Sequence, residues 1–228
     1  MKKLIYIADD EENILNLVKM FLESEGYNVK TFFTGDELFE EFIIKKPDLI
    51  ILDIMMPGTD GLTICNKIRN ISDIPIILLT AKDSDYDYIE GITLGSDDYL
   101  TKPFRPTILN MRVKSLLRRV EMSNKMKQDE DTICGNLVLS EKKRAIYCEN
   151  NEIKLTQTEY LCLGYLMKHF KEAISREDML EEVWGYNESV ETRVTDETIR
   201  RIRKKLSNND CNVVINNKWG YGYILEEK

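Results

Sequence analysis

Five polar side chains in the first half of the sequence have the types and spacing that phosphoryl transfer requires. Each follows a run typical of a buried parallel strand: Asp9 and Asp10, Asp53, Thr80 and Lys102. Because the carboxyl ends of parallel strands meet at one edge of a sheet, we expect these groups to converge. Converging carboxylates repel one another unless a cation lies between them, and Mg²⁺ retains waters that a phosphoryl oxygen can replace. A carboxylate nucleophile, a metal, a hydroxyl and an ammonium together predict a phosphoryl-transfer site.

The elements that must position these groups alternate strictly between strand and helix. Strands are predicted at residues 4–8, 27–33, 49–52, 75–79 and 99–101. The helices between them include 35–44, 61–70 and 83–94, and the last helix is predicted at 106–120. This alternation predicts an α/β fold, a doubly wound parallel five-stranded sheet with helices on both faces.

The pattern changes after a segment without apolar periodicity, which indicates a linker. We therefore divide the chain into domains at 1–121 and 132–228, joined by a linker at 122–131. The second domain begins with short strands predicted at 133–139, 144–148 and 153–155. Helices follow from a capping box at Thr156–Glu159, from Ser175 and from about 192 to 206, before a hairpin at 213–225. Three helices followed by a hairpin predict an α+β winged helix-turn-helix domain.

The third of these helices carries five basic residues among the six from Arg200 to Lys205. A helix placed before a wing can enter the major groove of DNA, where arginine reads guanine and lysine bonds phosphate. The spacing of Thr195, Ile199, Ile202 and Leu206 predicts the inward stripe. It leaves seven residues facing solvent or a groove: Arg193, Asp196, Thr198, Arg200, Arg201, Arg203 and Lys204. Lys218 in the hairpin is predicted to contact a phosphate.

Composition narrows the class of protein. The net charge is −8, which argues against a generally basic nucleic-acid binder and makes DNA contact depend on local clusters of lysine and arginine. The five cysteines are widely spaced and the chain has one histidine, so zinc and disulfide frameworks are not predicted. The apolar run after Met1 is too short for a signal peptide or a membrane span. We expect a cytoplasmic protein without a membrane partner.

The first domain resembles the receiver domain of two-component response regulators, a flavodoxin-like fold. The matching motifs are Asp9-Asp10, Asp53-Ile54-Met55-Met56-Pro57-Gly58, Thr80-Ala81 and Lys102-Pro103-Phe104. The resemblance implies that Asp53 accepts phosphate from a histidine kinase. It also implies that Asp10, Asp53 and the Met55 carbonyl hold Mg²⁺, with Asp9 acting through water. The resemblance further implies that the Lys102–Pro103 peptide is cis and that Tyr99 turns inward with Thr80, as a switch, on activation.

The second domain resembles the OmpR/PhoB-type effector domain, through motifs such as Val183-Trp184-Gly185 and Gly220-Tyr221-Gly222-Tyr223. The resemblance implies a homodimeric regulator of transcription that binds double-stranded promoter DNA, with RNA polymerase as a further expected partner. Trp219 stands at the wing tip where that family often has an arginine, and Thr198 stands where histidine is frequent.

The same resemblance implies that residues 83–119 form a dimer face, with exposed ion pairs between the two subunits. Two such pairs are expected here, Asp97 with Arg119 and Asp98 with Arg112. The third falls on Tyr88 and Ile108, which predicts an apolar contact unless both fold back onto their own domain.

The leading interpretation is a regulator of transcription that is controlled by phosphorylation. The sequence leaves two alternatives open. In the first, DNA binding is the same but the receiver dimerises without phosphate. In the second, the chain is a Mg²⁺-dependent aspartyl phosphohydrolase. Such enzymes usually carry a general-acid Asp two residues after the nucleophile, and Met55 occupies that position. The substitution predicts that the chain is not an enzyme.

Overall fold

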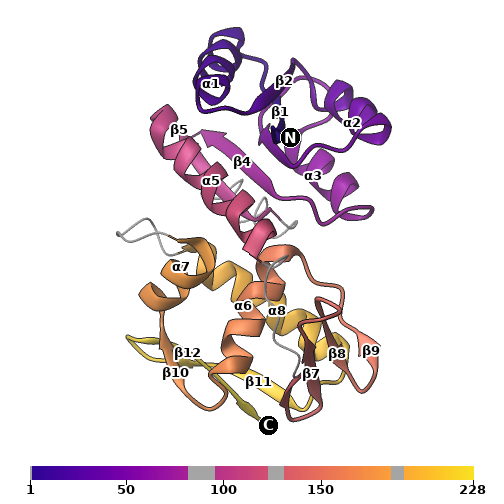
Figure 1. The fold of residues 1–228 in the computed structure, drawn as a ribbon, viewed down its shortest axis with the longest axis vertical. Coiled ribbons are helices and arrows are strands. Elements are labelled where there is room, and N and C mark those ends of the chain that lie inside the picture. The colour runs from indigo at the N-terminus through magenta and orange to yellow at the C-terminus, as the bar shows by residue number, and fades with distance from the viewer. Residues whose placement is uncertain (1, 82–95, 123–130, 186–192) are drawn as a thin grey trace. The chain divides into compact units, whose positions relative to one another are not determined.

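The structure is a computed structural model that describes residues 2–81, 96–122, 131–185 and 193–228. The chain forms two compact units, Met1–Leu117 and Arg118–Lys228 (Figure 1). The helix expected between residues 83 and 94 lies outside the described residues. Within the described ranges, no helix is both long and apolar enough to span a membrane.

The first unit is the predicted α/β fold. Its five strands are all parallel and lie in the order β2-β1-β3-β4-β5. The elements are β1 (Leu4–Ala8), α1 (Glu12–Ser24), β2 (Asn28–Phe32), α2 (Gly35–Ile44), β3 (Leu49–Asp53), α3 (Gly61–Arg69), β4 (Ile76–Ala81), β5 (Asp98–Lys102) and α5 (Pro106–Met122). Because β1 pairs with both β2 and β3, the strand order reverses at β1. In doubly wound sheets, ligands bind beside this point, at the carboxyl ends of the strands.

Alternate residues of the central strands point to opposite faces, and each face is covered by helices. Ile5, Ile7 and Ile51 pack with apolar residues of α1 and α5 into one core. On β1, Tyr6 alternates with these isoleucines and is buried, and its hydroxyl donates to the Lys45 carbonyl just after α2 (2.9 Å). Burial on both faces explains the unbroken apolar runs in the sequence.

The second unit is the predicted winged-helix domain. A four-stranded antiparallel sheet, β6-β7-β8-β9, precedes the helices, and a three-stranded sheet, β10-β12-β11, contains the wing. The elements are β6 (Thr132–Cys134), β7 (Leu137–Ser140), β8 (Ala145–Cys148), β9 (Asn151–Glu152), α6 (Gln157–Lys168), β10 (Ala173–Ser175), α7 (Arg176–Trp184), α8 (Arg193–Asn208), β11 (Val213–Lys218) and β12 (Gly222–Glu227).

Three parts of this unit differ from the prediction. The single strand expected at 133–139 is two strands, β6 and β7, which pair with each other across a turn at Gly135 and Asn136. The strand expected at 153–155 is wrong, because Cys148 pairs with Asn151 across the two-residue turn Glu149-Asn150 and places β9 earlier. Both turn residues have positive φ, 49° and 74°, as a type I′ hairpin turn requires. The sequence analysis did not predict β10, because three residues carry too little periodicity. This strand pairs with β12 and extends the sheet of the wing.

Helices α6 and α7 begin at the capping residues that the sequence predicts, Thr156 and Ser175. Thr156 Oγ1 accepts from the Glu159 amide (3.4 Å), while Glu159 Oε2 accepts from the Thr156 amide (2.8 Å), which completes the predicted capping box. Ser175 Oγ accepts from the Asp178 amide (2.9 Å) and caps α7, and Gly185 ends this helix in the left-handed conformation. On α8 the stripe of Thr195, Ile199, Ile202 and Leu206 is buried as predicted.

Candidate functional site

The acidic cluster lies at the carboxyl ends of β1 and β3. Asp9 directly follows β1 and Asp53 ends β3, and these strands are in parallel register with Ala8 opposite Leu52. One carboxylate oxygen of each of the three residues Asp9, Asp10 and Asp53 lies within 4.8 Å of those of the other two. Asp9 and Asp53 are buried, whereas Asp10 is exposed. The fold thus gathers the three predicted carboxylates at the strand-order reversal.

The Lys102 ammonium lies between the two buried carboxylates. Its Nζ is 2.9 Å from Asp53 Oδ2, 2.8 Å from Asp9 Oδ2 and 3.4 Å from Glu11 Oε1. Burial lowers the pKa of Lys102, but its hydrogen bonds to Asp53 and Asp9 raise the pKa further, so the net shift is upward. Lys102 is therefore a fixed positive charge beside Asp53, as a group that neutralises a phosphoryl oxygen must be.

Burial also changes the acidity of the carboxylates. Desolvation raises the pKa of Asp53 to about 6, although the hydrogen bond and charge of Lys102 oppose the rise. Desolvation likewise raises the pKa of Asp9, against hydrogen bonds from Lys102 and the Glu11 amide. A single ammonium thus compensates the two buried carboxylates only in part. At neutral pH Asp53 is still mainly ionised and can act as a nucleophile.

The turn after β3 holds α3 against the acidic cluster. Gly61, the first residue of α3, donates its amide to the Ile54 carbonyl (2.9 Å). A Cβ at this position would lie 1.9 Å from the Asp53 carbonyl oxygen, so only glycine allows this approach. Met55, two residues after Asp53, is exposed. Its amide donates a hydrogen bond to the Asp53 carboxylate, which lowers the pKa of Asp53.

The remaining predicted receiver residues lie on β4 and β5. Thr80 and Tyr99 are both buried, Thr80 on the strand between those of Asp53 and Lys102. Tyr99 lies opposite Leu78 in the sheet. The peptide bond between Lys102 and Pro103 is cis, as expected from the resemblance.

The donor set of the cluster fits a small divalent cation that prefers oxygen. Asp9 Oδ2 is engaged by Lys102, and Asp9 Oδ1 accepts the Glu11 amide at 2.9 Å. Asp10 is exposed to water beside it. Mg²⁺ binds few carboxylates directly and keeps several waters, so a partly exposed cluster with one internally engaged carboxylate suits it.

Three residues expected at an exposed dimer face are instead buried within one subunit. Asp97 Oδ2 lies 2.5 Å from Arg69 Nη2 and accepts the Ile76 amide at 3.0 Å. Asp98 Oδ1 lies 2.5 Å from Arg112 Nη1. The expectation that Asp97, Asp98 and Arg112 are exposed is therefore wrong, because each aspartate at the start of β5 is neutralised by an arginine of its own chain.

Ile108 was also expected on that face. Ile108 is partly buried and packs against the core of its own unit, so the apolar surface predicted for a partner is at least in part used internally. Tyr88 and the side chain of Arg119 lie outside the described residues.

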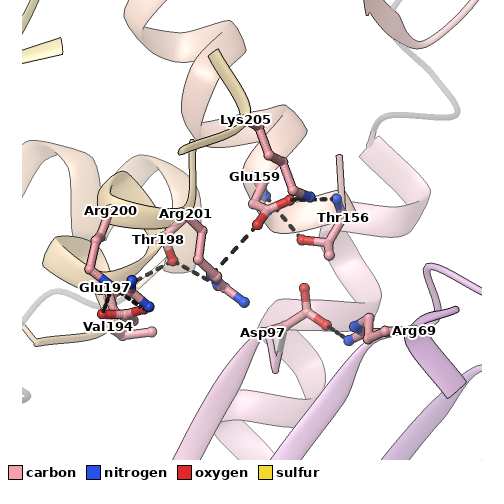
Figure 2. Close-up of polar contacts among 10 residues, drawn as sticks. All are labelled: Arg69, Asp97, Thr156, Glu159, Val194, Glu197, Thr198, Arg200, Arg201 and Lys205. Atoms are coloured by element: carbon pink, nitrogen blue, oxygen red, sulfur yellow. Dashed lines mark hydrogen bonds and ion pairs between the residues drawn. The ribbon is translucent and has the colours of Figure 1, made fainter. Parts of the chain in front are cut away.

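On α8, the outward basic residues are fewer than predicted. Arg200 and Lys204 are exposed, and Arg200 Nη2 lies 2.5 Å from Glu197 Oε1 (Figure 2). On the wing, Lys218 is exposed. Asp196 is exposed and accepts from Arg176 at 3.2 Å and from the Tyr223 hydroxyl. The side chain of Arg193 lies outside the described residues.

Two predicted DNA-facing residues point into the domain, and that expectation of their orientation is wrong. Thr198 is buried and donates its hydroxyl to the Val194 carbonyl at 2.8 Å, one helical turn back. Arg201 is only 6% exposed, and its Nε lies 3.5 Å from Glu159 Oε1 on α6. Lys205 Nζ lies 2.5 Å from the other oxygen, Glu159 Oε2. Figure 2 shows Arg201 and Lys205 both linked to Glu159. The apolar spacing of α8 did not reveal this, because an acidic partner on another helix decides it.

Arg203 links the helix to the wing. It is half-buried, its Nε donates to the Ile215 carbonyl (2.8 Å), and its Nη2 donates to Asn217 Oδ1 (2.7 Å). The predicted outward position of Arg203 is therefore only partly correct, since much of its hydrogen-bonding capacity holds β11.

Sequence reasoning missed three charged residues: Glu11, Arg69 and Glu159. The sequence identified Glu159 as part of a capping box, but not as the partner of Arg201 and Lys205, because these two cations come from α8. For Glu11 and Arg69 the partners are 91 and 28 residues away, and no local pattern connects them.

Comparisons with known proteins agree with this division of the chain. The family model "Response regulator receiver domain" matches residues 5–114, and the model "Transcriptional regulatory protein, C terminal" matches residues 150–225.

Several relatives match along nearly the whole chain. The alkaline phosphatase synthesis transcriptional regulatory protein PhoP of Bacillus subtilis is 39% identical, covering 100% of this chain and 98% of the relative. The regulatory protein VanR of Enterococcus faecium is also 39% identical and covers 100% of both chains. Among solved structures, the response regulator DrrB, a Thermotoga maritima OmpR/PhoB homolog, has a TM-score of 0.51 at 32% identity, covering 99% of this chain and 100% of that one.

Proposed function

Because the chain belongs to the OmpR/PhoB family of two-component response regulators, we propose that Asp53 is the residue that receives the phosphoryl group from a sensor histidine kinase. As a member of this family it is a phosphorylation-dependent, DNA-binding regulator of transcription. The observation that carries the assignment to Asp53 is the Lys102 ammonium, 2.9 Å from its carboxylate at the strand-order reversal.

In the proposed transfer, an Asp53 carboxylate oxygen attacks the phosphorus of the phosphohistidine. The P–N bond breaks as the P–O bond forms, and the histidine nitrogen leaves. Lys102 neutralises an oxygen of the incoming group, and the Thr80 hydroxyl on the neighbouring strand donates to another once the group is in place. Thr80 and Tyr99 then form the switch that carries the change to the rest of the receiver.

Mg²⁺ is the cofactor we propose for the acidic cluster. Asp10, Asp53 and the Met55 carbonyl would hold the ion directly, and Asp9 would act through water because its oxygens are engaged by Lys102 and the Glu11 amide. When bound, the ion would offset the repulsion of the carboxylates and neutralise charge on the transferred group.

The output we propose is binding of promoter DNA by α8 and the wing. Arg200 and Lys204 are exposed on α8 and Lys218 is exposed on the wing, so these three are the described cations best placed to reach a duplex. Arg193 would join them from the start of the helix. Cytoplasmic location and contact with RNA polymerase are part of the same proposal.

Homodimerisation is proposed as the link between phosphorylation and DNA binding. The face of residues 83–119 stays the candidate, but without the charge pairs of Asp97 and Asp98, which are used inside the subunit. The completeness of the acidic site favours control by phosphate over a receiver that dimerises without it. Hydrolysis of external phosphate esters is disfavoured, because Met55 carries no proton to donate to a leaving group.

A small phosphodonor tests the assignment of Asp53. Incubation of the full-length chain with acetyl phosphate and Mg²⁺ should add one phosphoryl group to the wild type and none to Asp53→Asn, as measured by intact mass. The matched control is Asp60→Asn, because Asp60 is the N-cap of α3, the helix that follows Asp53 in the chain, and asparagine is an equally good cap. Equal labelling of wild type and Asp53→Asn would contradict the proposal.

A further inference from the structure

A small cavity lies in the second domain, where β7, α6 and α7 meet. Its volume is about 100 Å³. Most of its wall is apolar and includes Leu139 of β7, Leu161 of α6 and Val183 of α7, and a few polar side chains complete it. Binding sites for small molecules have this composition. None of its described wall residues takes part in the proposed phosphoryl transfer or DNA contact.

Packing does not explain the glycine in this wall. Gly164 lies inside α6, where glycine destabilises a helix relative to alanine. Among the described residues, a Cβ built on Gly164 would meet only methyl carbons of Leu139, at 3.7 and 3.8 Å. These are ordinary van der Waals distances, so an alanine would fit. The effect of the glycine is to leave the space in front of it open.

The wall also contains a buried carboxylate that has only one of its oxygens paired. The side chain of Glu141 is 7% exposed, and its Oε1 lies 2.6 Å from Lys168 Nζ. Its Oε2 is buried and accepts no hydrogen bond from the described part of the chain, which destabilises the fold. The terminal torsion of a glutamate is broad, so the carboxylate can turn one oxygen toward the cavity while the other stays on Lys168.

The charges around the cavity favour a cation. Glu141 and Lys168 neutralise each other, whereas Glu182 is exposed and forms no ion pair with a described residue. Burial raises the pKa of the Tyr160 hydroxyl and the charge of Glu141 raises it further, while burial and the charge of Glu182 act in the same way on Tyr165. Both tyrosines line the cavity, and tyrosine rings also attract cations to their faces.

We propose that this cavity binds a small organic ammonium ion, a primary amine with an apolar body of about four carbons. The ammonium donates to the unpaired oxygen of Glu141, and Glu182 balances its charge. The apolar body packs on Leu139 and Val183, in the space that Gly164 leaves open. A cavity of about 150 Å³ accommodates benzene, so about 100 Å³ limits the body to roughly four carbons. The site depends neither on the acidic cluster nor on DNA.

Three ligands with the same body and different heads test the chemical class. Butylammonium, 1-butanol and butyrate are titrated separately into the full-length chain, and the methyl NMR signals of Leu139 and Val183 report binding. Butylammonium should shift both signals and bind about tenfold more tightly than 1-butanol, because its head is charged, and butyrate should not bind. Equal affinities of butylammonium and 1-butanol, or binding of butyrate, would overturn the assignment of an ammonium ligand. Signals that respond to none of the three would overturn the site itself.

Two substitutions place the ligand in the cavity. Gly164→Ala should weaken butylammonium binding at least tenfold without lowering the melting temperature, because alanine fills the space and suits the helix better. Glu141→Gln should abolish the preference for butylammonium over 1-butanol. The matched control is Glu181→Gln, since Glu181 is exposed on α7 beside Glu182 but does not line the cavity, and it should keep the preference. Unchanged binding in Gly164→Ala, or equal preferences in Glu141→Gln and wild type, would overturn the proposal.

Discussion

Lys205 Nζ lies 2.5 Å from Glu159 Oε2, so a cation of the most basic helix is bound to an acid inside the domain. The other oxygen of Glu159 faces Arg201, and the same carboxylate completes the cap of α6 through the Thr156 amide. One buried acid therefore fixes the packing of α6 against α8. It also divides the basic residues of α8 into those that hold the helix in place and those that remain for DNA.

Glu159→Gln should destabilise the second domain. Glutamine keeps the acceptor for the Thr156 amide but removes the negative charge that faces Arg201 and Lys205, and we expect a loss of about 2 kcal/mol or more. Urea unfolding, followed through the transition of the second domain, measures this loss in the free energy of unfolding. Glu227→Gln is the control, since Glu227 pairs with Lys171 on the surface and its loss should cost less than about 1 kcal/mol. Similar costs for the two variants would contradict the role of Glu159.

Contacts to DNA should follow exposure rather than charge count. Lys204→Ala removes an exposed cation and should weaken all duplexes alike, while Arg200→Ala should cost roughly 1–3 kcal/mol if the arginine reads a base. Thr198→Val should leave affinity unchanged, because the Thr198 hydroxyl is buried and bonded to Val194. Titration of a selected duplex at fixed salt checks all three. A large loss in Thr198→Val would show that α8 is oriented differently when bound.

Arg69→Met should lower the stability of the first domain, not its self-association. Asp97 would stay buried beside the Ile76 amide without the guanidinium of Arg69, at a cost of about 3–5 kcal/mol. Thermal unfolding and sedimentation of the full-length chain separate the two effects. Lys67→Met serves as the control, because Lys67 is exposed on α3, the same helix as Arg69. A variant that dissociates without loss of melting temperature would place Asp97 in the contact between subunits.

Without Mg²⁺, Asp53→Asn should make the first domain more stable at pH 7.5. Because desolvation raises the pKa of Asp53 to about 6, the folded protein binds this proton more tightly than the unfolded chain. The contribution of Asp53 is thus fully favourable below its ordinary pKa and is lost as the pH rises through about 6. Asparagine should gain roughly 1–3 kcal/mol at pH 7.5 and less at pH 5, measured by urea unfolding in EDTA. Equal stabilities at pH 7.5 would contradict this account.

Much of the fold could be predicted because its signals are local. The apolar runs at β1, β3 and β4 reflect burial on both faces, and strand-helix alternation leaves a parallel sheet as the solution. The polar residues that end those runs converge because parallel strands share one carboxyl edge, so Asp9, Asp53 and Lys102 were found together. The capping residues Thr156 and Ser175 likewise act within one turn of their helices.

The sequence by itself therefore determined the strand-helix alternation of the first domain, the acidic site and the basic helix beside a wing. Only the tertiary structure decided the partners of charged residues on different elements. Asp97 and Asp98 are neutralised by arginines of α3 and α5, and Arg201 is drawn inward by Glu159. The physical reason is that an ion pair depends on distance in space, and the long side chains of arginine and lysine reach acids that apolar periodicity does not register.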